Sequence, residues 1–213
     1  MQRAAVLFTG RVKTWEEQLT YLQSMKVSIE ASTGLPVDFF CSAGCYKESF
    51  DGFVAALDVK ASEYTTYEID PVILTYPVLG PGTKHYNYTS MLFHMKNAHR
   101  IMEEYATANG IEYKVVVRWR ADLICHTPFK IAWPIPLNTI FVPQCDDNGG
   151  INDRCAYGEG VAMKKYTHLY DYIHEFAKDL PMHAETYLLR HIRTQGLQTQ
   201  RYELSTRLHD GRS

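Results

Sequence analysis

The sequence predicts an α/β fold with three layers, in which helices cover both faces of a mostly parallel central sheet of about six strands. Short apolar runs rich in β-branched residues alternate with longer segments in which apolar residues recur at helical spacing. A helix between two strands returns the chain in the same direction and so makes the strands parallel. With 213 residues, of which 46% are hydrophobic, the chain can build one substantial core, and we expect a single domain over residues 1–213.

The first predicted strand and helix make up the opening unit of the chain. Residues 4–8 form an apolar run that a Thr-Gly pair ends, as expected of a buried strand. A helix is expected to begin near Thr14, which has capping-box spacing to Glu17, and to end at Gly34. The further elements expected in the first half are strands at 37–41 and 67–69, a helix at 50–59, a loop rich in proline and glycine at 70–84, and a long helix from Thr89 or Ser90 to Asn109.

The second half of the chain is expected to add further strands and two helices. Residues 113–117 contain three consecutive valines, as in a strand that is buried on both faces. Further strands are expected at 139–142 and 158–163, and helices at 165–177 and 183–194. The end of the sequence is polar, which is compatible with a chain that continues into the further domains of a longer protein.

Composition excludes several classes of function. A net charge of -2 and a pI near 6.5 leave no broad basic face, so we expect no nucleic-acid partner. No apolar run approaches the roughly 18 residues that a membrane helix needs, and the one at the N-terminus is too short for a signal peptide. Of the five cysteines only Cys41 and Cys45 lie close together, and no second pair completes a zinc site. We therefore expect no membrane span and a reducing, cytoplasmic location without secretion.

Charged residues close the valine-rich strand. Arg118, Arg120 and Asp122 occupy alternate positions, so in an extended segment their side chains point the same way. Mostly parallel sheets bind ligands at the carboxyl ends of their strands. Two guanidiniums can hold phosphate oxygens and a carboxylate can ligate a divalent cation, a combination that suits a nucleoside diphosphate bound with its metal. The alternative interpretation is an internal salt-bridge cluster at the edge of the sheet.

These residues also carry a resemblance to a known family. The stretch Arg-Trp-Arg-Ala-Asp at 118–122 follows a long predicted helix and precedes Asn-Asp-Arg-Cys-Ala-Tyr-Gly at 152–158, and this arrangement resembles the GT-A glycosyltransferases. Nearly the whole chain resembles the N-terminal glycosyltransferase domain of a multidomain protein from a large chlorella virus. The resemblance implies a Rossmann-like GT-A fold that uses a nucleotide sugar, often a UDP-sugar such as UDP-glucose. It also implies Mn²⁺ or Mg²⁺, held by an Asp-x-Asp motif.

The metal site implied by the resemblance departs from the family pattern. Arg120 stands where the family has the first aspartate, so Asp122 is the one carboxylate of the motif that remains. Manganese also accepts imidazole, and His209 lies where a histidine near the end of the domain completes the site in several GT-A groups. The alternative for His209 is a solvated histidine in the polar tail.

Two loops complete the predicted site. The loop after the first strand usually touches the nucleotide in this family, where Gly10 permits close approach and Arg11 adds charge; an ordinary strand-to-helix turn is the alternative. The polar stretch 144–154 does not follow the EF-hand order, and the resemblance places it beside the sugar, with Asp153 accepting hydrogen bonds from sugar hydroxyls. A plain surface turn is its alternative. The predicted nucleotide-sugar-binding residues are Thr9, Gly10, Arg11, Arg118, Arg120, Asp122, Gly149, Gly150 and Asn152.

The catalytic candidates are two carboxylates, Asp153 and Glu185. The family often presents an acidic residue to the acceptor hydroxyl near Glu185, whose alternative is a favourable position in the first turn of a helix. Tyr86 and Tyr88 alternate along the chain and can stack on a base or a sugar, although the presence of fifteen tyrosines makes chance placement the simpler interpretation.

We therefore expect a metal-assisted glycosyltransferase that moves a hexose or deoxyhexose from a UDP-sugar to a hydroxyl of a glycan or glycoprotein, with retention of configuration. If the viral resemblance holds, the acceptor is a glycan on a capsid glycoprotein and the location is the host cytoplasm. Two alternatives stay open: a non-catalytic domain that binds a nucleotide sugar or carbohydrate, and a nucleotide-sugar hydrolase. The sequence has no P-loop, no dinucleotide-binding glycine motif after a strand and no zinc-protease motif.

Overall fold

The structure is a computed structural model that describes residues 1–13, 15–44, 46–80, 84–125, 127–204 and 206–208. Its main sheet has seven strands in the order β3-β2-β1-β4-β7-β6-β8. These strands are β1 (Gln2–Thr9), β2 (Val37–Ala43), β3 (Ala61–Tyr64), β4 (Glu112–Arg120), β6 (Thr139–Pro143), β7 (Cys155–Gly158) and β8 (Gln198–Tyr202). Neighbouring strands are parallel, except that β7 runs antiparallel to β4 and β6. The predicted α/β fold with a mostly parallel sheet is confirmed, with one strand more than expected.

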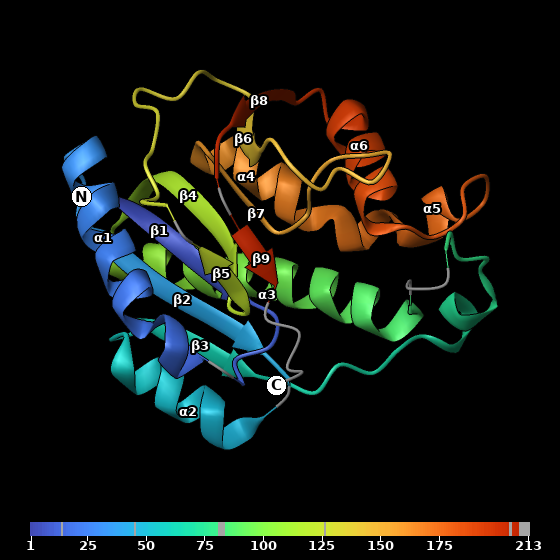
Figure 1. Cartoon of the computed structure of the whole chain (residues 1–213), viewed down its shortest axis with the longest axis horizontal. Coiled ribbons are helices and arrows are strands. Elements are labelled where there is room, and N and C mark those ends of the chain that lie inside the picture. Colours follow the sequence, from blue (N-terminus) through green and yellow to red (C-terminus); the bar gives the residue numbers. More distant parts are fainter. Residues whose placement is uncertain (14, 45, 81–83, 126, 205, 209–213) are drawn as a thin grey trace.

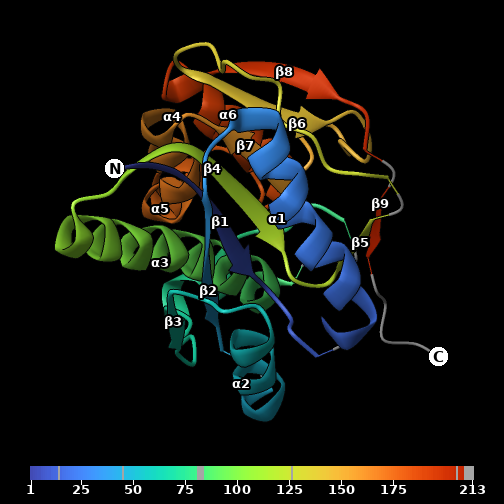
Figure 2. The same ribbon diagram turned by 90° about the vertical axis from the view of Figure 1, so that its left-hand side faces the viewer.

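Helices cover both faces of the sheet (Figure 1). One face carries α1 (Leu19–Thr33) and α2 (Lys47–Ala56). The other face carries α3 (His85–Asn109), α4 (Gly160–Thr167), α5 (Ile173–Phe176) and α6 (Ala184–Thr194). Three short 3₁₀ helices join these elements: η1 (Trp15–Gln18), η2 (Pro71–Thr75) and η3 (His168–Tyr172). Figure 2 shows α1 and α3 on opposite sides of β1, so the described chain has the three layers that the sequence predicts.

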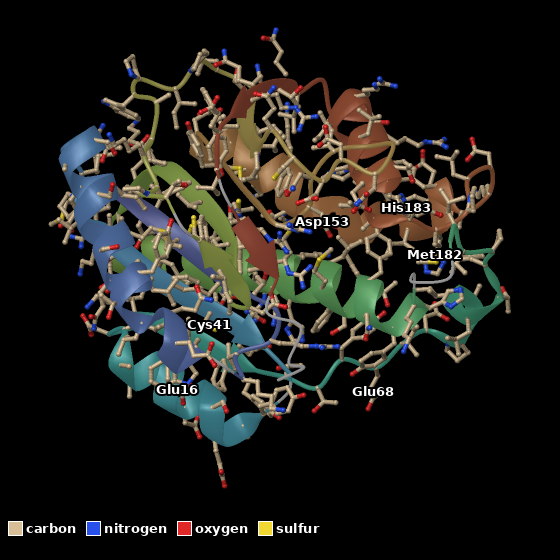
Figure 3. The ribbon with its side chains drawn as sticks, viewed as in Figure 1. Glu16, Cys41, Glu68, Asp153, Met182 and His183 are labelled. Atoms are coloured by element: carbon tan, nitrogen blue, oxygen red, sulfur yellow. The ribbon has the colours of Figure 1, made fainter. Side chains whose placement is uncertain are left out.

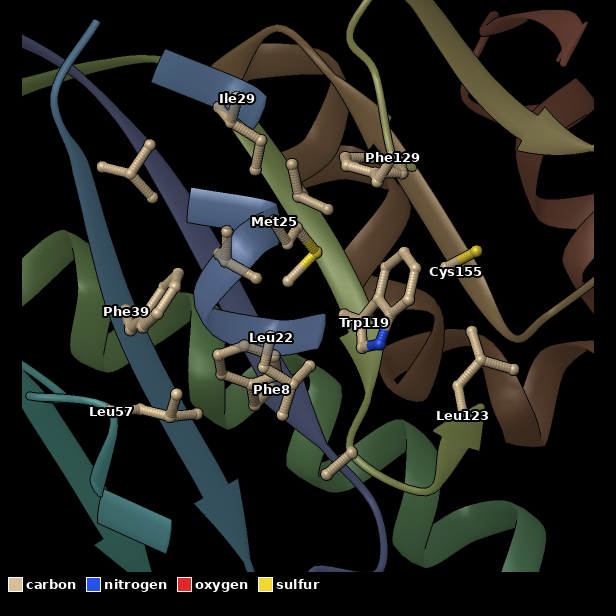
Figure 4. Packing of buried hydrophobic residues seen from close by; sticks show 14 of the residues in the cluster. Phe8, Leu22, Met25, Ile29, Phe39, Leu57, Trp119, Leu123, Phe129 and Cys155 are labelled. Carbon is tan, nitrogen blue, oxygen red and sulfur yellow. The ribbon is translucent and has the colours of Figure 1, made fainter. Parts of the chain in front are cut away.

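Side-chain alternation along the central strands explains the two cores. In β1, Phe8 faces α1 and α2, whereas Leu7 faces α3. In β4, Trp119 is fully buried on the α1 side and meets Phe129 edge to face at 5.2 Å (Figure 4). Burial of each such large side chain stabilises the fold by about 1.5–3 kcal/mol. The even positions of β4, which include Arg118 and Arg120, face the opposite side.

A small second sheet forms directly after β4. The strands β5 (Leu123–Cys125) and β9 (Thr206–Leu208) pair antiparallel, so the C-terminal part of the chain returns to the end of β4. Neither β8 nor β9 was expected, because their sequences are polar and show no apolar run. β8 is an edge strand whose residues are mostly exposed, and such a strand needs no apolar face. None of the helices in the described part of the chain combines the length and the hydropathy of a bilayer-spanning segment.

Three predicted elements are wrong or displaced. No strand forms at 67–69; β3 lies earlier, where half-buried polar residues pair with β2. The strand expected at 158–163 is the end of β7 followed by the start of α4, because the three apolar residues at 161–163 are too few to distinguish a strand from a helix. The helix expected at 165–177 begins at Gly160 and is divided into α4, η3 and α5.

The start of α3 differs from the prediction, and the first turn of the helical segment that contains α1 is a 3₁₀ helix. α3 begins at His85, before Thr89, and the Thr89 hydroxyl donates to the His85 carbonyl at 2.8 Å instead of capping the helix. α1 begins at Leu19, after η1, and its N-cap is Gln18 without a side-chain cap. Thr14, the predicted cap, lies outside the described residues. η1 begins at Trp15 and α1 follows it without a break, so the helical segment starts where the sequence predicts.

Candidate functional site

A cleft of about 850 Å³ opens at the carboxyl ends of β1 and β4. Segments that lie far apart in the sequence line it: the loops after β1 and β2, the end of β4, the start of α3, the loop before β7 and the start of α6. Carboxyl ends of parallel strands are where α/β sheets bind ligands, so this cleft is the candidate site. The predicted site residues that line it are Gly10, Arg11, Arg120, Asp122, Asp153 and Glu185.

The turn after β1 brings a glycine against Asp122. Gly10 has a φ of +97°, which residues with a side chain rarely adopt, and a Cβ there would lie 3.7 Å from Oδ1 of Asp122. The backbone N–H of Ala121 donates to the Thr9 carbonyl at 2.8 Å, which ties the two strand ends together. Thr9 itself is fully buried and does not line the cleft, whereas Arg11 is exposed there. The structure therefore places Gly10 and Arg11 at the cleft without the Thr9 side chain.

Arg120 and Asp122 form an ion pair inside the cleft, which we call the cleft pair. Nε of Arg120 donates to Oδ1 of Asp122 at 3.0 Å, and Nη2 donates to Oδ2 at 2.9 Å. The two side chains are 21% and 7% exposed. Burial opposes the charge on Arg120, but attraction to Asp122 raises the pKa of Arg120 above its usual value. The salt bridge that the sequence left open as an alternative is present, and it lines the cleft.

Arg118 lies deeper in the protein than Arg120. Its side chain is fully buried, and Nη1 donates to the backbone carbonyl of Asp153. Nε and Nη2 have no hydrogen-bond partner among the described residues, and burial lowers the pKa of Arg118. Arg118 does not line the cleft. It supports the backbone of a residue that does, and its predicted contact with the nucleotide sugar remains a prediction.

The polar loop before β7 is stabilised from within. Asn152 is fully buried, its Nδ2 donates to the Cys145 carbonyl at 2.7 Å, and its Oδ1 accepts from the Arg154 backbone N–H at 2.9 Å. Because these bonds use both ends of the amide, Asn152 holds the loop and does not line the cleft. Its neighbour Asp153 is half-buried and does line the cleft. Figure 3 shows Asp153 and His183 beside α3, in a region that α6 also approaches.

The glycines of this loop contact α6. A Cβ on Gly150 would lie 2.0 Å from the Glu185 carbonyl oxygen, so only glycine fits between the loop and the first turn of α6. The backbone N–H of Ile151 donates to the same carbonyl at 3.1 Å. Gly149 is exposed with a φ of +83°. Neither glycine lines the cleft. Gly150 is in close contact with the backbone of α6, and contact of either glycine with a sugar remains a prediction.

Glu185 is held by two neighbours at the start of α6. Its Oε1 accepts from Nδ2 of Asn148 at 2.8 Å, and its Oε2 lies 3.4 Å from Nε2 of His183. A bridge between Val78 and Met182 fixes the chain just before His183 to the segment that leads into α3. The wall of the cleft that carries Glu185 is therefore connected to the opposite wall.

Lys84, Tyr88, His94 and His183 are among the polar residues that line the cleft and that were not included in the predicted site. Tyr88 is 6% exposed, its hydroxyl has no partner among the described residues, and burial together with the charge of Asp153 raises its pKa. The alternating tyrosines were a signal for it. No local signal identifies His94, which lies within α3 and whose Nδ1 is 2.9 Å from Oγ of Ser42.

The described residues do not fit a divalent cation. Both carboxylate oxygens of Asp122 accept hydrogen bonds from Arg120, whose positive charge opposes a metal ion at the same oxygens. Within the ranges that the structure describes, no three His, Cys, Asp or Glu side chains are grouped so that they could hold a metal ion. His209 lies outside the described residues. A cation bound in the cleft would neutralise part of the charge of a diphosphate.

Comparisons with known proteins give a likeness of architecture only. No protein-family model matches the chain. No curated protein matches it either. The structure of mouse xyloside xylosyltransferase 1 in its apo form aligns with 95% of this chain and 85% of its own, at 12% identity and a TM-score of 0.44. The galactosyltransferase LgtC in complex with donor and acceptor sugar analogs aligns with 92% of this chain and 72% of its own, at 10% identity and a TM-score of 0.47.

A third similar structure is a glycosyltransferase involved in the glycosylation of the major capsid of PBCV-1. It aligns with 94% of this chain and 81% of its own, at 9% identity and a TM-score of 0.45. Identities and scores this low transfer no residue role. We therefore infer the function from the residues of the cleft itself.

Proposed function

We propose that this protein is a glycosyltransferase that moves a hexose or deoxyhexose from a UDP-sugar to a hydroxyl of a glycan. The observation that carries the proposal is the distribution of charge in the cleft. Arg11, Lys84 and Arg120 come from the ends of β1 and β4 and the start of α3, whereas Asp153 and Glu185 come from the loop before β7 and from α6. One cleft thus offers cations for a diphosphate and carboxylates for a sugar and its acceptor.

The reaction requires stabilisation of a departing diphosphate. As the bond from the sugar carbon to the diphosphate oxygen breaks, negative charge grows on that oxygen and positive charge grows on the sugar ring. Cations fixed beforehand near the diphosphate lower the barrier, because they need no rearrangement during the reaction. Arg120 meets this requirement best among the described cations of the cleft, since its guanidinium is held by Asp122.

We assign different roles to the two carboxylates. The carboxylate of Asp153 makes no hydrogen bond or ion pair with the residues that the structure describes, so its oxygens are free to accept from sugar hydroxyls. Glu185 is already engaged by Asn148 and His183 and is proposed to orient the acceptor hydroxyl. With Asp153 at the sugar, Glu185 engaged and Asp122 bonded to Arg120, the described residues of the cleft include no carboxylate dedicated to deprotonating the acceptor. We therefore propose retention of configuration.

The donor and the acceptor are tested separately. Release of UDP should be measured from a panel of UDP-hexoses and UDP-deoxyhexoses, with and without oligosaccharide acceptors, and with metal-free and manganese-containing buffers. Acceleration by an acceptor supports transfer. Release that no acceptor accelerates would identify a nucleotide-sugar hydrolase, and binding without release would identify a non-catalytic domain. NMR of the product's anomeric proton decides between retention and inversion.

The wider setting is also proposed from the sequence resemblance. A capsid glycan as the acceptor, a viral source and a location in the host cytoplasm follow from the likeness to a chlorella-virus domain.

A thermal-shift panel with UDP, GDP and CMP tests which nucleotide the protein binds, because a ligand that binds the native state raises its melting temperature. Stabilisation by GDP alone would contradict the UDP assignment.

A further inference from the structure

We propose that the cleft binds the diphosphate of its nucleotide directly through Arg120, without a divalent cation, and that Asp122 is a positioning residue for the Arg120 guanidinium. This inference rests on the proposed function in that a nucleoside diphosphate is the ligand. In this inference the Arg120 guanidinium takes the place of the metal ion that the sequence resemblance led us to expect.

Arg120 has N–H donors that its bonds to Asp122 leave unused. A guanidinium has five N–H donors, and Nε and Nη2 each donate one to Asp122. Nη1 makes no hydrogen bond with the described residues, and it is not among their buried unpartnered atoms. The side chain is 21% exposed and lines the cleft. Arg120 can therefore donate to phosphate oxygens while Asp122 still holds it.

Asp122 is unsuited to the role of metal ligand. It is 7% exposed, and the oxygens that a cation would need are those that accept from Arg120. A divalent cation at these oxygens would have to displace the guanidinium or lie beside its positive charge at short range, where repulsion is strong in a partly buried site. A diphosphate has the opposite sign and meets no such obstacle.

Two further cations extend the positive side of the cleft. Arg11 and Lys84 are exposed, line the cleft and form no ion pair with any described residue. Together with Arg120 they place three positive charges at the ends of β1 and β4 and at the start of α3, while the same cleft also holds the carboxylates of Asp122, Asp153 and Glu185. Tyr88 gives an independent indication of a ligand near Asp153 and Glu185, the two acidic residues whose charge adds to the effect of burial in raising its pKa. Its buried hydroxyl has no hydrogen-bond partner among the described residues.

A second ion pair in the same protein provides a matched control. Nε and Nη2 of Arg3 donate to the two carboxylate oxygens of Asp38 at 2.5 and 2.8 Å, in the same arrangement as in the cleft pair. We call it the amino-end pair, because it lies near the starts of β1 and β2. Neither residue lines the cleft. Substitution of Arg3 therefore removes an equivalent ion pair without touching the proposed site.

The test is isothermal titration calorimetry of UDP with the whole chain, in excess EDTA and in excess manganese chloride. We expect the Kd values in the two buffers to agree within about twofold, and Arg120→Gln to weaken binding by about tenfold or more in EDTA, as for loss of a charged hydrogen bond. Arg120→Lys should restore part of the affinity, Asp122→Asn should weaken binding less than Arg120→Gln, and Arg3→Gln should leave it unchanged. Thermal melts of each variant separate unfolding from loss of the site.

The outcomes distinguish this inference from the proposed function. Binding that disappears in EDTA, or that Arg120→Gln leaves intact in a folded protein, overturns direct binding by Arg120. Acceptor-dependent release of UDP in manganese alone would then keep the glycosyltransferase while removing the inference. UDP binding in EDTA without any turnover keeps the inference and removes the transferase. An absence of UDP binding in both buffers overturns both.

Discussion

Two arginine–carboxylate pairs lie at opposite ends of the same sheet, and only one of them faces a cleft. The amino-end pair and the cleft pair have the same two-point geometry and similar burial, with arginines 22% and 21% exposed and carboxylates 2% and 7% exposed. They differ in what else is present. Asp38 accepts a third hydrogen bond, from the Tyr113 hydroxyl at 2.8 Å, whereas Asp122 is bonded through its side chain to Arg120 alone among the described residues.

The comparison shows that two ion pairs of the same geometry can serve different functions, depending on where in the fold they lie. At the amino ends of the strands, Arg3, Asp38 and Tyr113 satisfy one another within the packed protein. At the carboxyl ends, the strands diverge into loops that cannot fill the space between them, and the same chemistry faces an open volume. Substitutions at the amino end should therefore lower stability, and those at the carboxyl end should lower ligand binding or turnover.

The largest expected effect is at the carboxyl end. Asp153→Asn should lower transferase turnover by about 10- to 100-fold, the range for loss of charged hydrogen bonds to the donor sugar, while UDP affinity stays within about twofold. Steady-state kinetics of UDP release measure the turnover, and calorimetric titration with UDP measures the affinity. Asp179→Asn, which removes an exposed ion pair with Arg190, is the control and should leave turnover unchanged. Normal turnover in Asp153→Asn would remove Asp153 from the site.

The amino-end pair should show the reverse pattern. Asp38→Asn weakens two charged hydrogen bonds and one from Tyr113, so we expect a loss of about 2–3 kcal/mol in the free energy of unfolding, measured by urea denaturation. UDP affinity should not change, because Asp38 does not line the cleft. Weaker UDP binding in a folded Asp38→Asn protein would show that the two ends of the sheet are coupled.

A buried histidine should make the carboxyl end sensitive to acid. Burial lowers the pKa of His94 from 6.5 to about 4. Because the folded pKa lies below the unfolded value, the unfolded chain binds more protons between these limits, and stability falls as the pH decreases through this window. By this linkage, a change from pH 7 to pH 5 removes about 2 kcal/mol.

Urea denaturation at both pH values measures this loss. His94→Gln should reduce the difference between pH 7 and pH 5, although it also removes the contact with Ser42 at both pH values. His174→Gln, at a side chain 52% exposed, should retain the full difference. An unchanged pH dependence in His94→Gln would show that another group is responsible.

The smallest expected effect separates two glycines in left-handed conformations. Gly10→Ala and Gly34→Ala should each cost about 1 kcal/mol of stability, because both positions have a φ that alanine adopts with strain. Gly34 ends α1, and a Cβ there meets nothing within 4 Å, whereas Gly10 lies in the cleft against Asp122. Only Gly10→Ala should weaken UDP binding in calorimetry. Equal affinities for the two variants would remove the β1 turn from the ligand site.

The fold could be predicted where burial leaves a mark on the sequence. β1 and β4 are buried on both faces and read as continuous apolar runs, so both were predicted. β8 was missed because its residues are mostly exposed at an edge, and β3 because its half-buried residues carry no pattern. The segment at 158–163 was misread because its three consecutive apolar residues, 161–163, are too few to distinguish a strand from the first turn of a helix.

The candidate site could be predicted in part. Gly10, Arg120 and Asp122 follow the ends of recognisable strands, and strand ends in a parallel sheet meet at one edge. Arg118 shares its strand face with Arg120, yet it is fully buried, because the packing of α4 and the loop before β7 decides how far along β4 the cleft reaches. Tyr88 was indicated by its alternation with Tyr86, whereas His94 lies within α3, where no neighbouring residue indicates which face meets the cleft.

By itself, the sequence determined an α/β chain with a mostly parallel sheet and charged residues at the end of its central strand, because strand burial and turn chemistry are local properties. Only the tertiary structure decided that Gly150 packs against α6 and that Asp153 lines the cleft with a carboxylate that bonds to none of the described residues. These outcomes depend on distances between segments that lie 30 or more residues apart or on side-chain depth, and neither quantity is encoded in the spacing of residues along the chain.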